Sequence, residues 1–135
     1  MRTHCPFTIV SLCLCVLAFL LACKSENNDD EQAALAAKEY YDHLRAGRYD
    51  AYLSGIDGYA SLPDGYREEL LANARQFMAQ QDNEHNGIRD IRVSRAKKDT
   101  TFNCTFAYLV LCFGDSTNEE IMVPMVRNGE HWMMK

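Results

Sequence analysis

The sequence predicts an α+β domain in which three N-terminal helices pack on one face of a four-stranded antiparallel sheet. Apolar residues recur with the helical period of about 3.6 up to residue 82, and with the strand period of two from residue 88 onward. Helices that precede a run of strands are typical of the α+β class, and short connections between the strands favour an antiparallel meander. With 135 residues, 47% of them hydrophobic and 24% charged, the chain has the composition of a single folded domain.

The helical part divides into three segments. The first helix is expected to begin at Asp30 and to end at Gly47, and its apolar positions follow at helical spacing: Ala33, Ala37, Tyr40 and Leu44. A short second helix is expected over residues 49–54. The third helix is expected from about Pro63 or Asp64 to Asp82, where the turn-forming cluster DNEHNG ends it.

The rest of the chain predicts four strands: 88–97, 101–113, 119–127 and 131–135. The second strand alternates most clearly, and we expect one set of its side chains to face the helices: Phe102, Cys104, Phe106, Tyr108, Val110 and Cys112. Its other side, with Leu109, Leu111 and Phe113, would then lie on the open face of the sheet.

The dipeptide Asn128-Gly129 is a strong signal for a two-residue hairpin turn between the last two strands. This turn would place Met125 opposite Trp132 and would direct one set of side chains toward the core: Ile121, Val123, Met125, Trp132 and Met134. Pro124 points to the other side and lacks an N–H, so we expect a bulge or a missing ladder bond there.

Cys104 and Cys112 stand eight residues apart on one predicted strand. At the rise of a strand their Cα atoms would lie about 26 Å apart, whereas a disulfide tolerates at most about 7 Å. We therefore expect two buried free thiols.

The N-terminus has the pattern of a secretory signal. Residues 1–22 contain Arg2, no acidic residue, and an apolar stretch that is shorter than the about 20 residues of a membrane-spanning helix. Leu20-Leu21-Ala22-Cys23 resembles the lipobox of bacterial lipoproteins, in which the cysteine is acylated and becomes the N-terminus. Cys13 and Cys15 lie in the same apolar run, but each follows a leucine, which is too large for the cleavage site.

This resemblance implies three regions: a signal peptide over residues 1–22, lipidated Cys23 with a polar tether to residue 29, and one domain over residues 30–135. The acyl chains would anchor the protein to a membrane of the cell envelope. Lys24 follows the cysteine, and by analogy with enteric bacteria this favours the outer membrane, on either its periplasmic or its surface side.

Three segments of the mature chain are similar to small Bacteroidetes lipoproteins of unknown function: AAKEYYDHLRAGRYDAYLSGI, VLCFGDSTNEEIMVPMV and NGEHWMMK. Those proteins have a nuclear transport factor 2-like, or cystatin-like, fold. The resemblance implies a curved sheet that encloses a cone with the first helices. Some members leave the cone open as a pocket, among them ketosteroid isomerases, dehydratases and polyketide cyclases, and others use the same surface for protein contacts.

The residues expected between the sheet and the helices are the candidate lining of such a pocket: Tyr40, Phe77, Phe106, Tyr108, Met125 and Trp132. A filled core is the alternative, and it is favoured because a small domain needs most of its large side chains for packing. In an open pocket, the tyrosine hydroxyls would be polar groups in an apolar wall.

Catalytic and metal-binding signals are weak. Asp42, beside His43 on the first helix, is the least unfavourable candidate for a general base, but a solvated helix face is the favoured explanation. His43, His85 and His131 have none of the spacings typical of metal sites, so we expect neither a metal nor a cofactor. Without Arg2, 13 basic and 19 acidic side chains give a net charge of −6, which disfavours nucleic acid as a partner.

Basic residues gather on the first predicted strand, which is a sheet edge in a meander: Arg89, Arg92, Arg95, Lys97 and Lys98. They are suited to lipid headgroups or an anionic glycan, or they keep the edge from pairing with other chains. Together these observations predict a membrane-anchored envelope lipoprotein with a non-catalytic domain that binds a small ligand or an envelope protein. The alternative is an isomerase-like or dehydratase-like enzyme that uses the cone.

Overall fold

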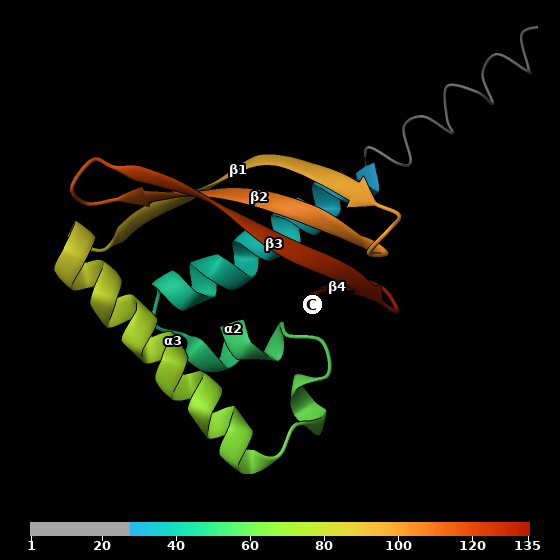
Figure 1. Ribbon diagram of the computed structural model, residues 1–135, viewed down its shortest axis with the longest axis horizontal. Helices are drawn as coiled ribbons and strands as arrows, with labels where there is room; N and C mark the ends of the chain where they lie inside the picture. The colour runs from blue at the N-terminus through green and yellow to red at the C-terminus, as the bar shows by residue number, and fades with distance from the viewer. Residues whose placement is uncertain (1–27) are drawn as a thin grey trace, which may run out of the picture.

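The computed structural model describes residues 28–135 (Figure 1). The predicted signal peptide and Cys23 lie outside the described residues. An N-terminal helix over residues 28–45 is followed by α2 (Tyr49–Ser54), the short 3-10 helix η1 (Tyr59–Ser61) and α3 (Asp64–His85). Four strands complete the domain: β1 (Ile88–Asp99), β2 (Cys104–Phe113), β3 (Asn118–Asn128) and β4 (His131–Met134).

The sheet is an antiparallel meander in the order β1-β2-β3-β4, and the N-terminal helix lies along one of its faces (Figure 1). The predicted α+β class and strand order are therefore confirmed. Ala33, Ala34 and Ala37 of this helix are at most 1% exposed, because their small side chains let the helix approach the sheet closely. The space between helix and sheet is a packed core and holds no open cone.

The predicted orientation of β2 is wrong. The side chains that face the helices are those at the odd-numbered positions, which were expected on the open face. They are almost fully buried: Thr105, Ala107, Leu109, Leu111 and Phe113. Phe106, Tyr108 and Val110 lie on the outer face of the sheet and are half-buried. Both sides of β2 are apolar, so alternation identifies the strand without telling which side is covered.

Cys104 and Cys112 are free and buried, as predicted. By the register of the strands they share the outer side of β2, where Cys104 is opposite Asp99 of β1 and Cys112 is opposite Asp90.

The hairpin between β3 and β4 turns one residue later than predicted. Asn128 pairs with His131, so the loop residues are Gly129 and Glu130, and Gly129 has a φ of 62° that favours glycine. Met125 is consequently opposite Met134 and not Trp132. The observed register and the predicted one differ by two residues, so every side chain stays on its predicted side of the sheet. Val123, Met125 and Met134 are accordingly buried in the core.

The pairing of β2 with β3 continues through Pro124 without a bulge. The carbonyl oxygen of Pro124 accepts a hydrogen bond from the N–H of Lys135, so its missing N–H also points toward β4 and away from β2. The proline therefore sits where β4 ends, and the expected bulge does not form.

Other element boundaries also differ from the prediction, by up to three residues. Helix α3 extends to His85 and ends at Asn86, whose φ of 57° is the left-handed conformation typical of helix ends. Strand β1 continues to Asp99, and the turn to β2 occupies residues 100–103. The carboxylate of Asp99 stabilises this turn, because its Oδ1 accepts hydrogen bonds from the N–H groups of Thr101 and Phe102 at 2.9 and 3.0 Å.

Candidate functional site

An apolar cavity of about 240 Å³ opens among the three helices, and we call it the helix cavity. The N-terminal helix, α2 and α3 contribute side chains to its wall, as does Ile56, which lies two residues after the end of α2. The lining residues are Tyr41, Leu44, Tyr52, Leu53, Ile56, Leu70, Asn73, Ala74 and Phe77. In Figure 1, α3 runs obliquely to the sheet, and it packs on α2.

Three uncharged polar groups interrupt the apolar wall: the hydroxyls of Tyr41 and Tyr52 and the amide of Asn73. The two tyrosine rings meet edge to face, with their centroids 5.5 Å apart and an angle of 78° between their planes. This is a favourable geometry for aromatic pairs, and it fixes both rings in the wall.

Burial raises the pKa of both tyrosines above the ordinary value of 10.0. For Tyr41 the neighbouring Tyr52 raises the pKa further, whereas Tyr41 partly offsets the effect of burial on Tyr52. Both hydroxyls therefore stay protonated near neutral pH, and they interact with each other.

The helix cavity is suited to binding a neutral molecule. Its volume is somewhat below the about 300–1,000 Å³ of most ligand pockets, which favours a small occupant. The wall offers apolar contact, hydroxyl donors and an amide that both donates and accepts. Two further hollows of about 390 and 270 Å³ lie on the surface, and each has three charged residues in its wall: Arg48, Asp50 and Arg75 in one and Asp64, Arg67 and Glu68 in the other.

No family model matches the chain, and no curated protein matches it. Among solved structures, a crystal structure from Campylobacter jejuni, provisionally named an NTF2-like transpeptidase, superposes with a TM-score of 0.59. The two chains are 16% identical, and the match covers 73% of this chain and 92% of the other. This chain has an NTF2-like fold. At this level of identity the similarity shows the fold alone.

Within this NTF2-like fold, only Phe77 of the six predicted pocket residues lines the helix cavity. Met125 is fully buried between the sheet and the N-terminal helix, where it fills the core. Phe106 and Tyr108 lie on the outer face of the sheet, because the orientation of β2 is the reverse of the predicted one. The guanidinium carbon of Arg95 lies 3.8 Å from the centre of the Tyr108 ring, so this ring is covered by a cation.

Tyr40 and Trp132 come together at the other side of the N-terminal helix. The Tyr40 hydroxyl donates a hydrogen bond of 2.9 Å to the backbone carbonyl of Trp132, and burial raises the pKa of Tyr40. The indole Nε1 of Trp132 is buried and has no hydrogen-bond partner among residues 28–135. These two residues join the helix to β4 and are not part of the helix cavity wall.

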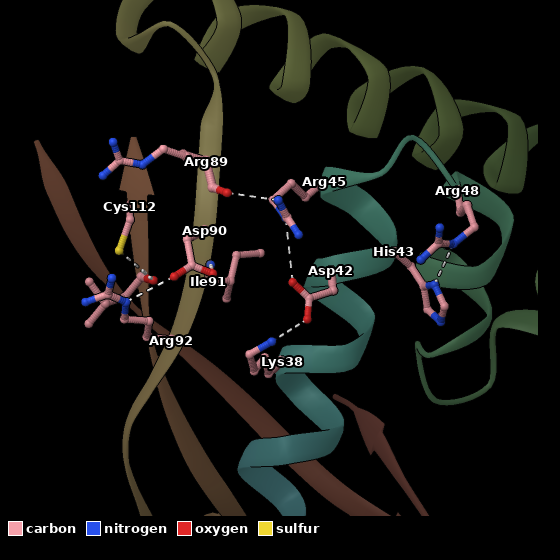
Figure 2. Close-up of polar contacts among 11 residues, drawn as sticks. Lys38, Asp42, His43, Arg45, Arg48, Arg89, Asp90, Ile91, Arg92 and Cys112 are labelled. Atoms are coloured by element: carbon pink, nitrogen blue, oxygen red, sulfur yellow. Dashed lines mark hydrogen bonds and ion pairs between the residues drawn. The ribbon is translucent and has the colours of Figure 1, made fainter. Parts of the chain in front are cut away.

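Asp42 and His43 point away from each other and into separate polar contacts (Figure 2). The carboxylate of Asp42 binds Lys38 and lies 3.7 Å from Arg45, whose guanidinium in turn donates to the backbone carbonyl of Arg89. His43 Nδ1 accepts a hydrogen bond of 2.9 Å from Arg48. Asp42 therefore belongs to an ion-pair network between helix and β1, outside the helix cavity.

Sequence reasoning missed eight of the nine residues that line the helix cavity. Their positions carry no chemical motif, because they are ordinary members of three amphipathic helices. The run of alanines near residue 35 was a usable signal, because small side chains indicate that the N-terminal helix packs closely on the sheet. Any open space then has to lie on the side of this helix that faces away from the sheet.

Across residues 28–135, the structure has no helix that is long and apolar enough to span a membrane. The same residues include no group of three or more His, Cys, Asp or Glu side chains placed to hold a metal ion.

Proposed function

We propose that this protein is a lipid-anchored lipoprotein of a bacterial cell envelope, of the kind found in Bacteroidetes, whose domain binds a small neutral ligand. The observation that carries the proposal is the composition of the helix cavity, in which apolar side chains surround two tyrosine hydroxyls and one amide. Such a wall recognises an apolar molecule with one or two hydrogen-bonding groups, for example a ketone, an ester or an alcohol.

The anchor rests on the sequence before the domain. Cys23 follows the small residue Ala22 at the end of an apolar stretch, and a charged and polar segment begins immediately after it. Two or three acyl chains on this cysteine would hold the protein on a membrane, since each buried CH₂ contributes about 0.8 kcal/mol. Lys24 favours the outer membrane.

Binding is favoured over catalysis because of what the wall lacks. None of the nine cavity residues is an acid, a histidine, a lysine, a serine, a threonine or a cysteine. An isomerase or dehydratase needs a group that moves a proton, and the transpeptidase activity in the name of the structural neighbour needs a nucleophile. The ionisable groups among the nine are the two tyrosine hydroxyls, and burial raises the pKa of both, which makes them poor bases and nucleophiles near neutral pH.

The ligand site is tested with prodan, a neutral naphthalene ketone whose fluorescence shifts to the blue in an apolar site. Ala74 is 7% exposed and lines the cavity, so Ala74→Phe should fill it and abolish the blue-shifted emission. Ala79→Phe is the matched control, because Ala79 is exposed on the same helix. Equal prodan binding by the two folded variants, or none by the unmodified protein, would overturn the proposal.

A further inference from the structure

The turn between β1 and β2 presents an aromatic side chain to solvent. Phe102 is 61% exposed, more than any other large hydrophobic residue that the structure describes. It is held in this position, because Asp99 Oδ1 accepts a hydrogen bond from its N–H and its ring meets Phe106 edge to face, with centroids 6.2 Å apart. An exposed aromatic side chain on a fixed turn is typical of a contact surface.

Lysines surround this aromatic side chain. Lys97 and Lys98 are exposed at the end of β1, and Lys135 Nζ lies 3.3 Å from the carbonyl oxygen of Phe102. Among residues 28–135, none of these three lysines has an ion-pair partner. One exposed phenylalanine of the turn is therefore accompanied by three exposed cations, beside the exposed and uncharged Thr100, Thr101 and Asn103.

Most acids at this end of the domain are engaged in local contacts. Asp99 caps the turn, Asp29 pairs with Arg127 at 3.3 Å, and Asp30 Oδ1 accepts a hydrogen bond of 3.2 Å from the hydroxyl of Thr105. Two exposed acids at this end have no such contact among the described residues: Glu31, and Glu130 in the β3–β4 hairpin. These carboxylates keep their charge but face local partners, whereas Lys97, Lys98 and Lys135 have no ion-pair partner among the described residues.

The same end of the domain carries the start of the chain. The contact of Asp30 with Thr105 places the first described turn of the N-terminal helix next to the start of β2, and Figure 1 shows this turn beside the end of β1. Cys23 precedes the first described residue, Asn28, by five residues, a distance that extended chain covers in at most about 18 Å. A lipid on Cys23 would keep Phe102 and its lysines close to the bilayer.

We propose that the β1–β2 turn docks on an anionic bilayer surface, with Phe102 at the headgroup level and Lys97, Lys98 and Lys135 on lipid phosphates. This inference rests on the lipid anchor of the proposed function. An aromatic side chain flanked by lysines suits the membrane interface, where the ring meets acyl chains and the cations meet anionic headgroups. Tyr41 of the helix cavity follows Asn28 by 13 residues, or about 20 Å along the helix, so the cavity stays away from the docked end.

The test uses the acylated full-length protein in vesicles, with a single exposed cysteine and a membrane-impermeant maleimide. Cys104 and Cys112 are buried and provide a low background. In vesicles that contain phosphatidylglycerol, Thr101→Cys should react at least about tenfold more slowly than in detergent, and either 0.5 M salt or an added Phe102→Ser should restore the rate. Asn83→Cys is the control, because Asn83 is exposed near the end of α3. It should react equally fast in vesicles and in detergent.

The outcomes separate the anchor from the docking. Protein that does not float with the vesicles overturns the lipid anchor, and the docking falls with it. Protein that floats while Thr101→Cys reacts as fast as Asn83→Cys leaves the anchor intact and overturns the docking. Equal slowing on vesicles of uncharged phosphatidylcholine overturns the role of the lysines.

Discussion

The aromatic ring of Tyr40 occupies the space that a Cβ atom on Gly55 would need, since an ideal Cβ there would lie 2.4 Å from Tyr40 Cδ1. The hydroxyl of the same tyrosine binds the backbone carbonyl of Trp132 at 2.9 Å. One side chain of the N-terminal helix therefore joins the end of α2 to β4. The close approach depends on glycine having no side chain.

Replacing Gly55 tests this relationship. Gly55→Ala should lower the free energy of unfolding by about 1–3 kcal/mol, because the ring of Tyr40 must move. Its φ of −75° is acceptable for alanine, so the cost is steric. Gly65→Ala is the matched control, since nothing lies within 4 Å of its Cβ position and it stands in the first turn of α3. It should stabilise the domain by about 0.5–1 kcal/mol.

Urea unfolding followed by circular dichroism measures both changes. In a Tyr40→Leu background the cost of Gly55→Ala should fall, because the flat ring is no longer in the way. An unchanged cost in that background would show that another neighbour of Gly55 is responsible.

The orientation of β2 makes a second prediction. Leu109 is fully buried against the helices, so Leu109→Ala should destabilise the domain by about 2–5 kcal/mol. Val110→Ala removes a half-buried side chain on the outer face and should cost about 1 kcal/mol or less. Thermal or urea unfolding of the two variants compares the faces directly. A larger cost for Val110→Ala would support the orientation that β2 was first expected to have.

A third prediction concerns acid stability and the contact between α3 and the β2–β3 turn. The hydroxyl and backbone N–H of Thr117 donate to Asp115 Oδ1 at 2.6 and 2.9 Å, and His85 Nδ1 lies 3.0 Å from Asp115 Oδ2. These contacts, those of Thr117 first, lower the pKa of Asp115 from 3.8 to about 2. The ionised carboxylate is therefore favoured in the folded protein.

Because the folded pKa is below the unfolded one, the stabilisation by Asp115 is present above pH 4 and disappears as the pH falls to about 2. Asp115→Asn should be less stable than the unmodified protein at pH 6, and this difference should shrink between pH 4 and pH 2. Melting temperatures across this range provide the measurement. A difference that stays constant with pH would mean that the ionisation of Asp115 does not contribute.

The fourth prediction concerns the anchor. Growth with an alkyne-modified fatty acid should label the unmodified protein, and Cys23→Ala should abolish the label. Cys13 and Cys15 should be unable to substitute, because each follows a leucine. Cys15→Ala is the control and should be labelled normally. Labelling of Cys23→Ala, or release of the unmodified protein into buffer without detergent, would contradict lipidation at this residue.

The elements of the fold follow from the sequence because each has a clear period or a clear end. The spacing of apolar residues locates the helices, and α2 begins and ends at the predicted residues. The face of β2 does not follow, since Phe106 and Tyr108 on one side are as apolar as Leu109 and Leu111 on the other. The side that is covered is decided by how the whole sheet packs on the N-terminal helix, which is tertiary information.

The candidate site was the least predictable part. A cone between sheet and helix is filled here because Ala33, Ala34 and Ala37 let the helix approach the strands. The open space then lies on the far side of that helix, where α3 leans away from the sheet. Its position depends on the angles between three helices, and the sequence of any one helix does not encode those angles.

The last strand has a partner beyond the hairpin. The N–H of Met134 donates to Gly55 and its carbonyl accepts from Asp57, both at 2.7 Å, so the segment after α2 shields the rim of β4. The exposed rim that remains in the described chain belongs to β1, whose register shifts twice and which carries five basic residues. Two copies meeting along that rim would repel each other, so crowding on a surface should not seed fibrils.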